Sequence, residues 1–236
     1  MNLILLSAED FVSAHRVVLA DRRRDHILSV HRAGQGDRLR VGLINGALGS
    51  GLVISADAAR VELEVQLDQQ PPAPLPVTLL LALPRPKMLK RILQTVTAMG
   101  IKQLYLLNSY RVDKSFWSSP FLQPEKITEQ LLLGLEQARD SILPEVHLRP
   151  RFKPFVEDEL PALSGHTTKL VAHPGGAHPC PRELLAPTTL AVGPEGGFID
   201  YEIARLEECG FTPVTLGSRI LRVETAVPVL LSRLSP

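Results

Sequence analysis

The sequence predicts an α/β protein with a small N-terminal module that is mainly β and a larger C-terminal domain built on a parallel sheet. Three observations support this prediction: an alternating segment at residues 61–67, a proline-rich segment directly after it, and short apolar runs alternating with helical patterns from residue 77 onwards. With 236 residues, 44% of them hydrophobic, the chain is long enough to bury a substantial core.

The N-terminal module is expected to cover residues 1–70. Apolar and polar residues alternate strictly over residues 61–67, which is typical of a strand with one buried face. The other elements expected here are strands over 38–44 and 52–54, a glycine-rich turn at 46–51 and a helix over 21–32.

A linker is predicted at residues 71–76. Residues 69–76 read QQPPAPLP, and four prolines in eight residues cannot lie inside a helix or a central strand. Such a segment favours an extended, semi-rigid connector. We therefore expect the second domain to cover residues 77–236.

The C-terminal domain is expected to alternate buried strands with helices, which indicates a parallel sheet. The expected strands cover 77–83, 101–107, 169–172, 189–192 and 212–216, and the expected helices cover 87–99, 124–139 and about 225–234. Gly100 is the expected stop of the first helix. Pro228 is compatible with the last helix only if that helix begins close to Glu224 or Thr225, because the first helical N–H groups have no intrahelical partner.

Composition excludes several classes of protein. The longest apolar run, residues 77–83, is too short to span a membrane, and the apolar start at 3–6 has no basic flank and is not expected to be a signal peptide. Cys180 and Cys209 do not form a CxxC pair, so neither a disulfide framework nor a cysteine-rich zinc site is expected. We expect a cytoplasmic protein with no membrane partner.

Charge is balanced overall but not locally. The chain has a net charge of +1, whereas residues 16–40 contain seven arginines against three aspartates. Arginine presents a planar fork that suits phosphate, so this segment indicates either contact with RNA or DNA or simply a solvated face.

Three glycine-bearing loops mark the expected site. They cover residues 172–176, 192–198 and 216–226, and each follows an expected strand. Ligands bind beyond the carboxyl ends of parallel strands, and glycine lets the main chain approach them, so we expect one pocket; ordinary turns between strands and helices are the alternative. No P-loop, GxGxxG or GxSxG motif is present. His173, His178 and Cys180 lack a fourth donor at suitable spacing, so no metal is expected.

The second and third loops resemble those of the ribosomal RNA small subunit methyltransferase E family, of the SPOUT class. The resemblance rests on VGPEGGF at 192–198 and LGSRILRVETA at 216–226, with weaker support from His173-Pro174, LEQAR at 135–139 and residues 38–46. It implies a knotted methyltransferase domain after a PUA-like RNA-binding domain. It also implies that S-adenosylmethionine serves to methylate N3 of a uridine in 16S ribosomal RNA, in the assembled small subunit, by a homodimer formed through the C-terminal domain.

The resemblance and the loops together select the candidate residues. The expected cofactor-binding residues are His173, Gly193, Glu195, Gly196, Gly197, Leu216, Gly217, Ile220, Leu221, Arg222 and Thr225. The expected RNA-binding residues are Arg16, Arg22, Arg23, Arg24, Arg38 and Lys87. Glu195 is expected to fix its own loop through backbone N–H groups.

The expected catalytic residues are Arg219, Arg222 and Glu224. Uridine N3 must lose a proton, and cationic groups near the base oxygens stabilise the resulting anion. We expect Arg219 to face the RNA, because it lies earlier in the loop, and Arg222 to anchor the loop. Glu224 is either a proton acceptor or a carboxylate that favours the start of the helix.

The chain departs from the family pattern at three positions. Thr95 and Ala98 stand where the family usually has Lys and Glu, and Ile199 stands where Ser or Thr is usual, with Asp200 as the expected replacement helix cap. Thr95 and Ala98 support one alternative, a non-catalytic RNA-binding or ribosome-associated protein that retains the fold. An enzyme that binds another adenosine cofactor is a further alternative.

Overall fold

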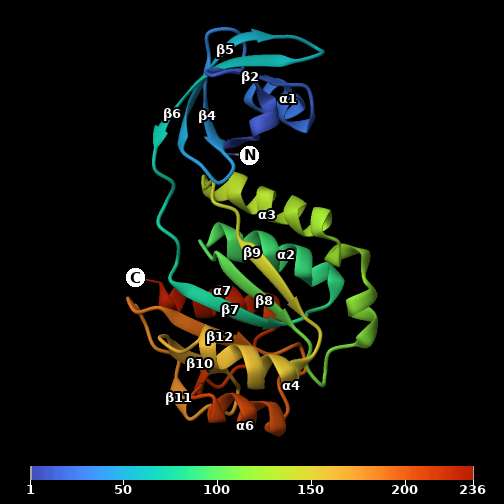
Figure 1. Ribbon diagram of the computed structural model, residues 1–236, viewed down its shortest axis with the longest axis vertical. Coiled ribbons are helices and arrows are strands. Elements are labelled where there is room, and N and C mark those ends of the chain that lie inside the picture. Colours follow the sequence, from blue (N-terminus) through green and yellow to red (C-terminus); the bar gives the residue numbers. More distant parts are fainter. Residues whose placement is uncertain (1, 236) are drawn as a thin grey trace. The chain divides into compact units, whose positions relative to one another are not determined.

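The computed structural model describes residues 2–235 and divides the chain into two compact units (Figure 1). The first unit contains the chain up to Ala73 together with Leu132–Leu143. The second contains Pro74–Leu131 and the chain from Pro144 onwards. The boundary at Ala73 falls inside the proline-rich segment, but the return of Leu132–Leu143 to the first unit differs from the predicted continuous domain over 77–236.

Within the described residues, the first unit forms a six-stranded sheet in the order β1-β4-β5-β6-β3-β2. Its strands are β1 (Ile4–Leu6), β2 (Phe11–Ser13), β3 (Arg16–Leu19), β4 (Arg38–Leu43), β5 (Leu48–Ala56) and β6 (Val61–Gln69). β1 runs parallel to β4, and the other pairs are antiparallel. The alternation in β6 is confirmed, because Val61, Leu63 and Val65 are buried in the core of this unit.

The predicted glycine-rich turn at 46–51 is wrong in extent. Gly49 and Gly51 lie inside β5 and pair with β6, so the turn is shorter and the strand longer than predicted. A Cβ at Gly49 would lie 1.8 Å from the carbonyl oxygen of Gln66. Glycine is therefore required here by close approach of two strands rather than by a turn.

The predicted helix at 21–32 is present in two parts. α1 (Arg22–His26) continues into a π-helical turn, η2 (Ile27–His31), whose Ile27 is fully buried. Asp21 caps α1, and its side chain accepts a hydrogen bond from the backbone N–H of Arg23. A one-turn 3-10 helix, η1 (Ala8–Asp10), lies between β1 and β2.

The end of α3 (Pro124–Ala138) and the residues after it belong to the first unit because they pack there. Leu135 is fully buried in a cluster with Leu3, Leu5 and Leu48. Beyond the helix, Ser141 Oγ donates a hydrogen bond of 2.5 Å to a backbone carbonyl of the β4–β5 turn. The hydrogen bond joins residues 95 positions apart in the chain, and no local sequence pattern predicts such a contact.

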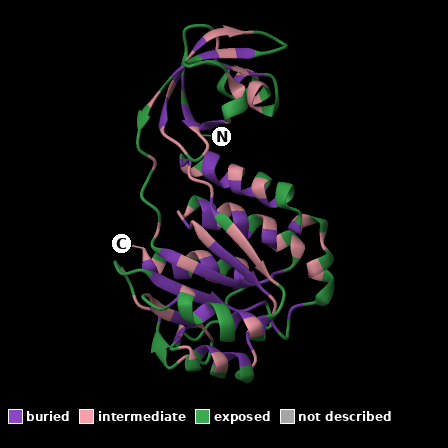
Figure 2. Ribbon diagram, in the orientation of Figure 1, coloured by how far each residue is buried: buried purple, intermediate pink, exposed green. Residues whose placement is uncertain are grey.

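The second unit contains, within the described residues, a seven-stranded parallel sheet in the order β11-β13-β10-β12-β7-β8-β9. Its strands are β7 (Val77–Ala82), β8 (Gln103–Leu107), β9 (Glu145–Arg149), β10 (Thr168–Ala172), β11 (His178–Pro179), β12 (Thr188–Val192) and β13 (Thr212–Thr215). The five predicted strands are confirmed, whereas β9 and β11 were not predicted. Figure 2 shows that the central strands of this sheet are buried.

Helices cover both faces of this sheet (Figure 1). The second unit contains α2 (Pro86–Ala98), most of α3, α4 (Phe152–Pro154), α5 (Leu160–Leu163), α6 (Asp200–Glu208) and α7 (Val223–Leu234), with η3 (Lys114–Ser118), η4 (Pro120–Leu122) and η5 (Phe155–Glu159). Gly100, at φ +84°, ends α2 as predicted. The described residues contain no helix long and apolar enough to cross a membrane.

The last helix begins earlier than expected. α7 starts at Val223, so Pro228 lies in its second turn rather than in its first. The helix nevertheless continues to Leu234, with Val227, Leu230 and Leu231 fully buried. Burial of this apolar side supports the helix across the missing N–H of the proline.

The sheet order places the three glycine-bearing loops together. β13, β10 and β12 are consecutive neighbours, and β7, which leads into α2, follows β12. The carboxyl ends of four adjacent parallel strands therefore meet at one edge.

Candidate active site

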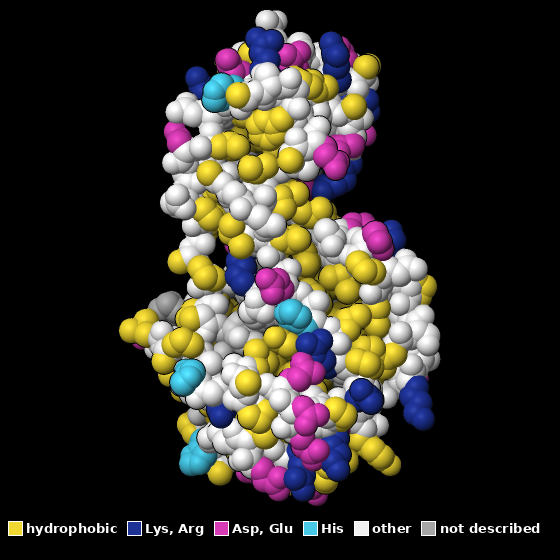
Figure 3. Space-filling model, viewed as in Figure 1, with side chains coloured by type: hydrophobic (Ala, Val, Ile, Leu, Met, Phe, Trp, Pro, Cys, Tyr) yellow, Lys and Arg dark blue, Asp and Glu magenta, His cyan; other side chains and the backbone are white. Residues whose placement is uncertain are grey.

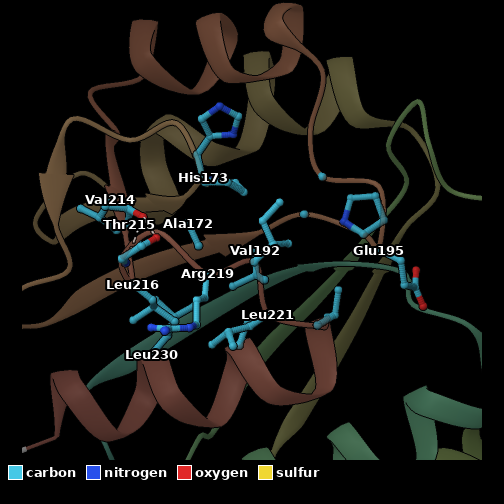
Figure 4. Close-up of a pocket in the computed structure, with 18 residues that line it drawn as sticks. Ala172, His173, Val192, Glu195, Val214, Thr215, Leu216, Arg219, Leu221 and Leu230 are labelled. Carbon is cyan, nitrogen blue, oxygen red and sulfur yellow. Dashed lines mark hydrogen bonds between the residues drawn. The ribbon is translucent and has the colours of Figure 1, made fainter.

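The three loops line one cavity at this edge, and α7 closes its other side (Figure 4). The lining residues are Ala172, His173, Pro174, Val192, Gly193, Pro194, Glu195, Gly197, Val214, Thr215, Leu216, Gly217, Arg219, Ile220, Leu221, Val223, Ala226 and Leu230. Eight of the expected cofactor-binding residues are among them: His173, Gly193, Glu195, Gly197, Leu216, Gly217, Ile220 and Leu221.

Main-chain hydrogen bonds hold the loops in place. The N–H of His173 donates to Val214 O at 2.9 Å, and the N–H of Gly197 donates to Pro194 O at 2.8 Å. Gly197 and Gly217 have φ of +72° and +116°, a backbone conformation that side chains disfavour. A Cβ at either glycine would meet no protein atom within 4 Å, so both positions border open space.

Gly196 and Thr225 do not line the cavity, although both were expected to bind a cofactor. Gly196 faces the loop after β8, where its carbonyl accepts a hydrogen bond from Arg111 Nη1 and an added Cβ would lie 2.9 Å from Arg111 Cδ. The N–H of Thr225 donates to Arg222 O at 2.9 Å in the first turn of α7. These two residues shape the loops from outside the cavity.

Glu195 connects its loop to the start of α2. Its Oε1 accepts a hydrogen bond of 3.0 Å from the backbone N–H of Arg85, a donor outside the loop of Glu195. In Figure 4 its carboxylate points away from the other labelled side chains. Glu195 also borders a second hollow beside the first.

Glu202 is a positioning residue that sequence reasoning missed. It is 3% exposed, and its carboxylate accepts hydrogen bonds from the N–H of Tyr110 at 2.7 Å and of Ile199 at 3.0 Å. Asp200, the expected cap of α6, is instead the first residue of that helix, and Ile199 holds the cap position. A Glu three residues after a helix cap is the available signal, because it can reach back to the cap N–H.

A second hollow of about 510 Å³ adjoins the cavity. It is lined by Arg85, Lys87, Met88, Glu195, Ile220, Leu221, Arg222 and Glu224, and it shares Glu195, Ile220 and Leu221 with the first cavity. Thr95 and Ala98, the departures from the family pattern in α2, line neither space.

The two arginines of the third loop border different spaces. Arg219 lines the first cavity (Figure 4). Arg222 lines the second hollow together with Glu224. Neither guanidinium has a hydrogen-bond or ion-pair partner among residues 2–235, so no contact supports the expected anchoring role of Arg222. Arg222 is exposed at the cap position of α7.

Most of the expected RNA-binding arginines are engaged inside the first unit. Arg22 donates to both carboxylate oxygens of Glu136, at 2.7 and 3.1 Å, and Arg24 donates to the carbonyl of Ala58 at 2.7 Å. Arg16 pairs with Glu62 at 3.2 Å but remains half exposed. These contacts give Arg22 and Arg24 partners within the first unit, and their RNA-binding role stays a prediction.

Arg23 is the most fully engaged of these residues. Its guanidinium is 13% exposed and donates to Asp10, Asp21 and the carbonyl of Leu5. Burial acts to lower the pKa of Arg23, but its hydrogen bonds to the two carboxylates outweigh burial and raise that pKa above its usual range. Arg23 therefore has a structural role in the first unit.

Arg38 and Lys87 remain open to solvent. Both are exposed, and neither has a hydrogen-bond or ion-pair partner in the described part of the chain. Arg38 borders a hollow on the outer face of the first sheet with His15, Ser50 and Glu64. Among the described residues, no group of three or more His, Cys, Asp and Glu side chains is arranged to hold a metal ion.

Comparison with known proteins shows that this fold and cavity belong to an RNA methyltransferase domain. The family described as RNA methyltransferase domain matches residues 71–235. A ribosomal RNA small subunit methyltransferase E of Synechocystis is 30% identical over 97% of this chain and 80% of its own. One of Treponema pallidum is 29% identical over 96% of this chain and 87% of its own. The chain belongs to the ribosomal RNA small subunit methyltransferase E family.

Solved structures show the same fold. The chain superposes on a ribosomal RNA small subunit methyltransferase E from Neisseria gonorrhoeae bound to S-adenosylmethionine with a TM-score of 0.77, at 23% identity over 98% of this chain and 95% of that one. A methyltransferase from Legionella pneumophila, also in complex with that cofactor, gives 0.75 at 22% identity over 99% and 96% of the two chains.

Proposed function

We propose that this protein uses S-adenosylmethionine to methylate N3 of a uridine in 16S ribosomal RNA. Membership of the family supports methylation of ribosomal RNA. The single observation that carries the proposal for this chain is the cavity built by three loops on adjacent parallel strands. The uridine and its N3 atom come from the family resemblance of the loop sequences.

The residues present fit such a cofactor. Gly197 and Gly217 leave open space where any other residue would place a Cβ, so the main chain can contact a ligand directly. Val192, Leu216 and Leu230 supply apolar surface for a ring, and His173 adds a polar edge. When bound, S-adenosylmethionine supplies a methyl group activated by its sulfonium.

The chain's own residues then act on the RNA base. We assign Arg222 to the uracil oxygens, where its charge stabilises the anion that forms when N3 loses its proton. Glu224 borders the same hollow and is the candidate acceptor of that proton. Arg219 borders the other cavity and is assigned to the cofactor side.

The proposal extends to features that the family resemblance implies. These are a knot in the second unit, a PUA-like RNA-binding role for the first unit, a homodimer formed through the second unit, the assembled small subunit as substrate, and a place in the cytoplasm. The alternative of a non-catalytic RNA-binding protein rests on Thr95 and Ala98. Because these residues line neither space at the site, we do not favour it.

The test starts with small subunits from a strain that lacks this modification. Purified protein and S-adenosylmethionine are added, and nucleosides from the 16S RNA are separated by mass spectrometry with an N3-methyluridine standard. The proposal expects that nucleoside to appear. A methyl group found on another atom would correct the position, and no methylation despite calorimetric binding of the cofactor would contradict the substrate.

A further inference from the structure

We infer that the second hollow binds one ribonucleotide of the RNA strand, with Arg85 and Lys87 as its phosphate ligands. The inference rests on the proposed function for the identity of the ligand. It goes beyond that function because it places the nucleotide in a defined space and assigns a role to Arg85, which no sequence motif indicated.

The first argument is charge. Arg85, Lys87 and Arg222 are all exposed, and none of their charged groups has a hydrogen-bond or ion-pair partner in the part of the chain that the structure describes. Two carboxylates border the same hollow, but Glu195 already accepts the backbone N–H of Arg85. Three unpaired cations facing one space favour an anion, and Arg in particular matches the geometry of phosphate oxygens.

Some basic side chains of the second unit pair with a nearby carboxylate, for example Arg149 with Glu159 and Arg205 with Glu208. In the described part of the chain, no carboxylate pairs with Arg85, Lys87 or Arg222, and these three cations border one hollow. On the face shown in Figure 3, acidic and basic side chains are interspersed over this unit. The hollow therefore has three cations against two carboxylates on its border, and this excess of positive charge favours a phosphate.

The second argument is the apolar wall. Ile220 is 82% exposed and Leu221 is 37% exposed, and Met88 completes the apolar part of the lining. Ile220 and Leu221 also border the first cavity, so their side chains stand between the two spaces. A nucleobase placed against them would cover apolar surface that is otherwise open to water, and it would lie next to the cofactor.

The third argument is size. A hollow of about 510 Å³ is comparable to a site for one small molecule, which spans about 300–1,000 Å³. Enzymes that modify a base inside a larger nucleic acid turn that nucleotide out of its stack and bind it alone. The phosphate then lies at Arg85 and Lys87, and the base lies against Ile220 with Arg222 beside it.

The position of Arg85 depends on Glu195. The hydrogen bond between Arg85 N and Glu195 Oε1 fixes the start of α2 to the loop that lines both spaces. Glu195 is thus a positioning residue for the phosphate ligand as well as for the cofactor loop.

The experiment compares Arg85→Ala and Lys87→Ala with Arg91→Ala, a control that removes an exposed cation from the same helix but outside both spaces. Filter binding of 16S ribosomal RNA is measured over a range of salt. We expect each of the first two variants to bind about tenfold more weakly. The log–log salt dependence should also be shallower by about 0.7 to 0.9 per cation removed. Arg91→Ala should match the native protein.

Cofactor affinity separates the two spaces. Calorimetric titration with S-adenosylmethionine should give the same affinity for all of these proteins. If Arg85→Ala and Lys87→Ala lost as much affinity for S-adenosylmethionine as for RNA, the inference would be overturned, because the hollow would then belong to the cofactor. RNA binding and salt dependence equal to those of Arg91→Ala would overturn it as well.

The same data distinguish this inference from the proposed function. If the native protein methylates the RNA while Arg85→Ala and Lys87→Ala bind RNA normally, the inference fails and the function stands. If the native protein binds RNA without methylating it, the function fails, and the salt dependence of the variants still decides the phosphate site.

Discussion

The carboxylate of Glu136 accepts two hydrogen bonds from the guanidinium of Arg22, although the residues lie 114 positions apart. Glu136 is 3% exposed, whereas the side chain of Arg22 is half exposed. This pair fixes the end of α3 to the first unit. It also gives a structural role to a Glu in the helical segment on which part of the family resemblance rests.

Arg22→Ala should therefore lower the free energy of unfolding of the first unit without lowering the affinity of the protein for RNA. Removing the guanidinium leaves the buried carboxylate of Glu136 unpaired, at a cost of about 1–3 kcal/mol in the free energy of unfolding. Urea unfolding followed by circular dichroism measures this. Arg16→Ala is the matched control, because its pair with Glu62 is half exposed and contributes less than about 1 kcal/mol. A clear loss of RNA affinity with an unchanged free energy of unfolding would instead support a direct contact between Arg22 and RNA.

The pair between Asp21 and Arg23 predicts a pH-dependent contribution to stability. Hydrogen bonds from the Arg23 side chain are the main cause that lowers the pKa of Asp21 below its usual 3.8, and burial opposes them. The contribution is thus fully present above pH 3.8 and is lost as pH falls through the lower pKa of the folded state.

Asp21→Asn tests this contribution, because Asn can still cap α1 but carries no charge. Its melting temperature should be below that of the native protein at neutral pH. The difference should narrow as pH is lowered beyond 3.8. Because the Asp21 side chain is about half exposed, the effect should be small. A difference that grows at acid pH would contradict the assigned direction.

The cofactor cavity predicts a specific effect of Gly217→Ala. The φ of +116° strains any residue other than glycine, and Gly217 lies in the lining of the cavity, so the strain changes the wall that a cofactor would contact. We expect calorimetry to show at least about tenfold weaker binding of S-adenosylmethionine. Gly210→Ala is the control, since φ is +88° there but the position is outside the cavity. If both variants lost the same affinity for S-adenosylmethionine, backbone strain alone would explain the effect, and the prediction for the cavity would be wrong.

The strands of the parallel sheet were predictable from the sequence because they are buried on both faces and read as apolar runs. β9 was missed because it reads EVHLR and four of its residues are only partly buried. The three loops of the site were predicted from their glycines, which lie within a few residues of the ends of expected strands in the sequence. Glu202 was missed because its role depends on a backbone N–H 92 positions away. Likewise, composition revealed the cluster of arginines at 16–40, but their carboxylate partners, including Glu136, are set by the fold.

The most direct prediction concerns Arg219 and Arg222, which border different spaces. Arg222→Lys keeps the charge beside Glu224 but loses the planar fork, so the uracil anion is less well stabilised. Single-turnover methylation should slow by about 10²-fold, with cofactor affinity unchanged. Arg219→Lys should instead weaken cofactor binding and leave the rate at saturating cofactor close to native, because its side chain lines the other cavity. Thermal melts of both variants check that they fold. A rate loss in Arg219→Lys at saturating cofactor, with a native rate in Arg222→Lys, would place Arg219 at the base and return Arg222 to the anchoring role.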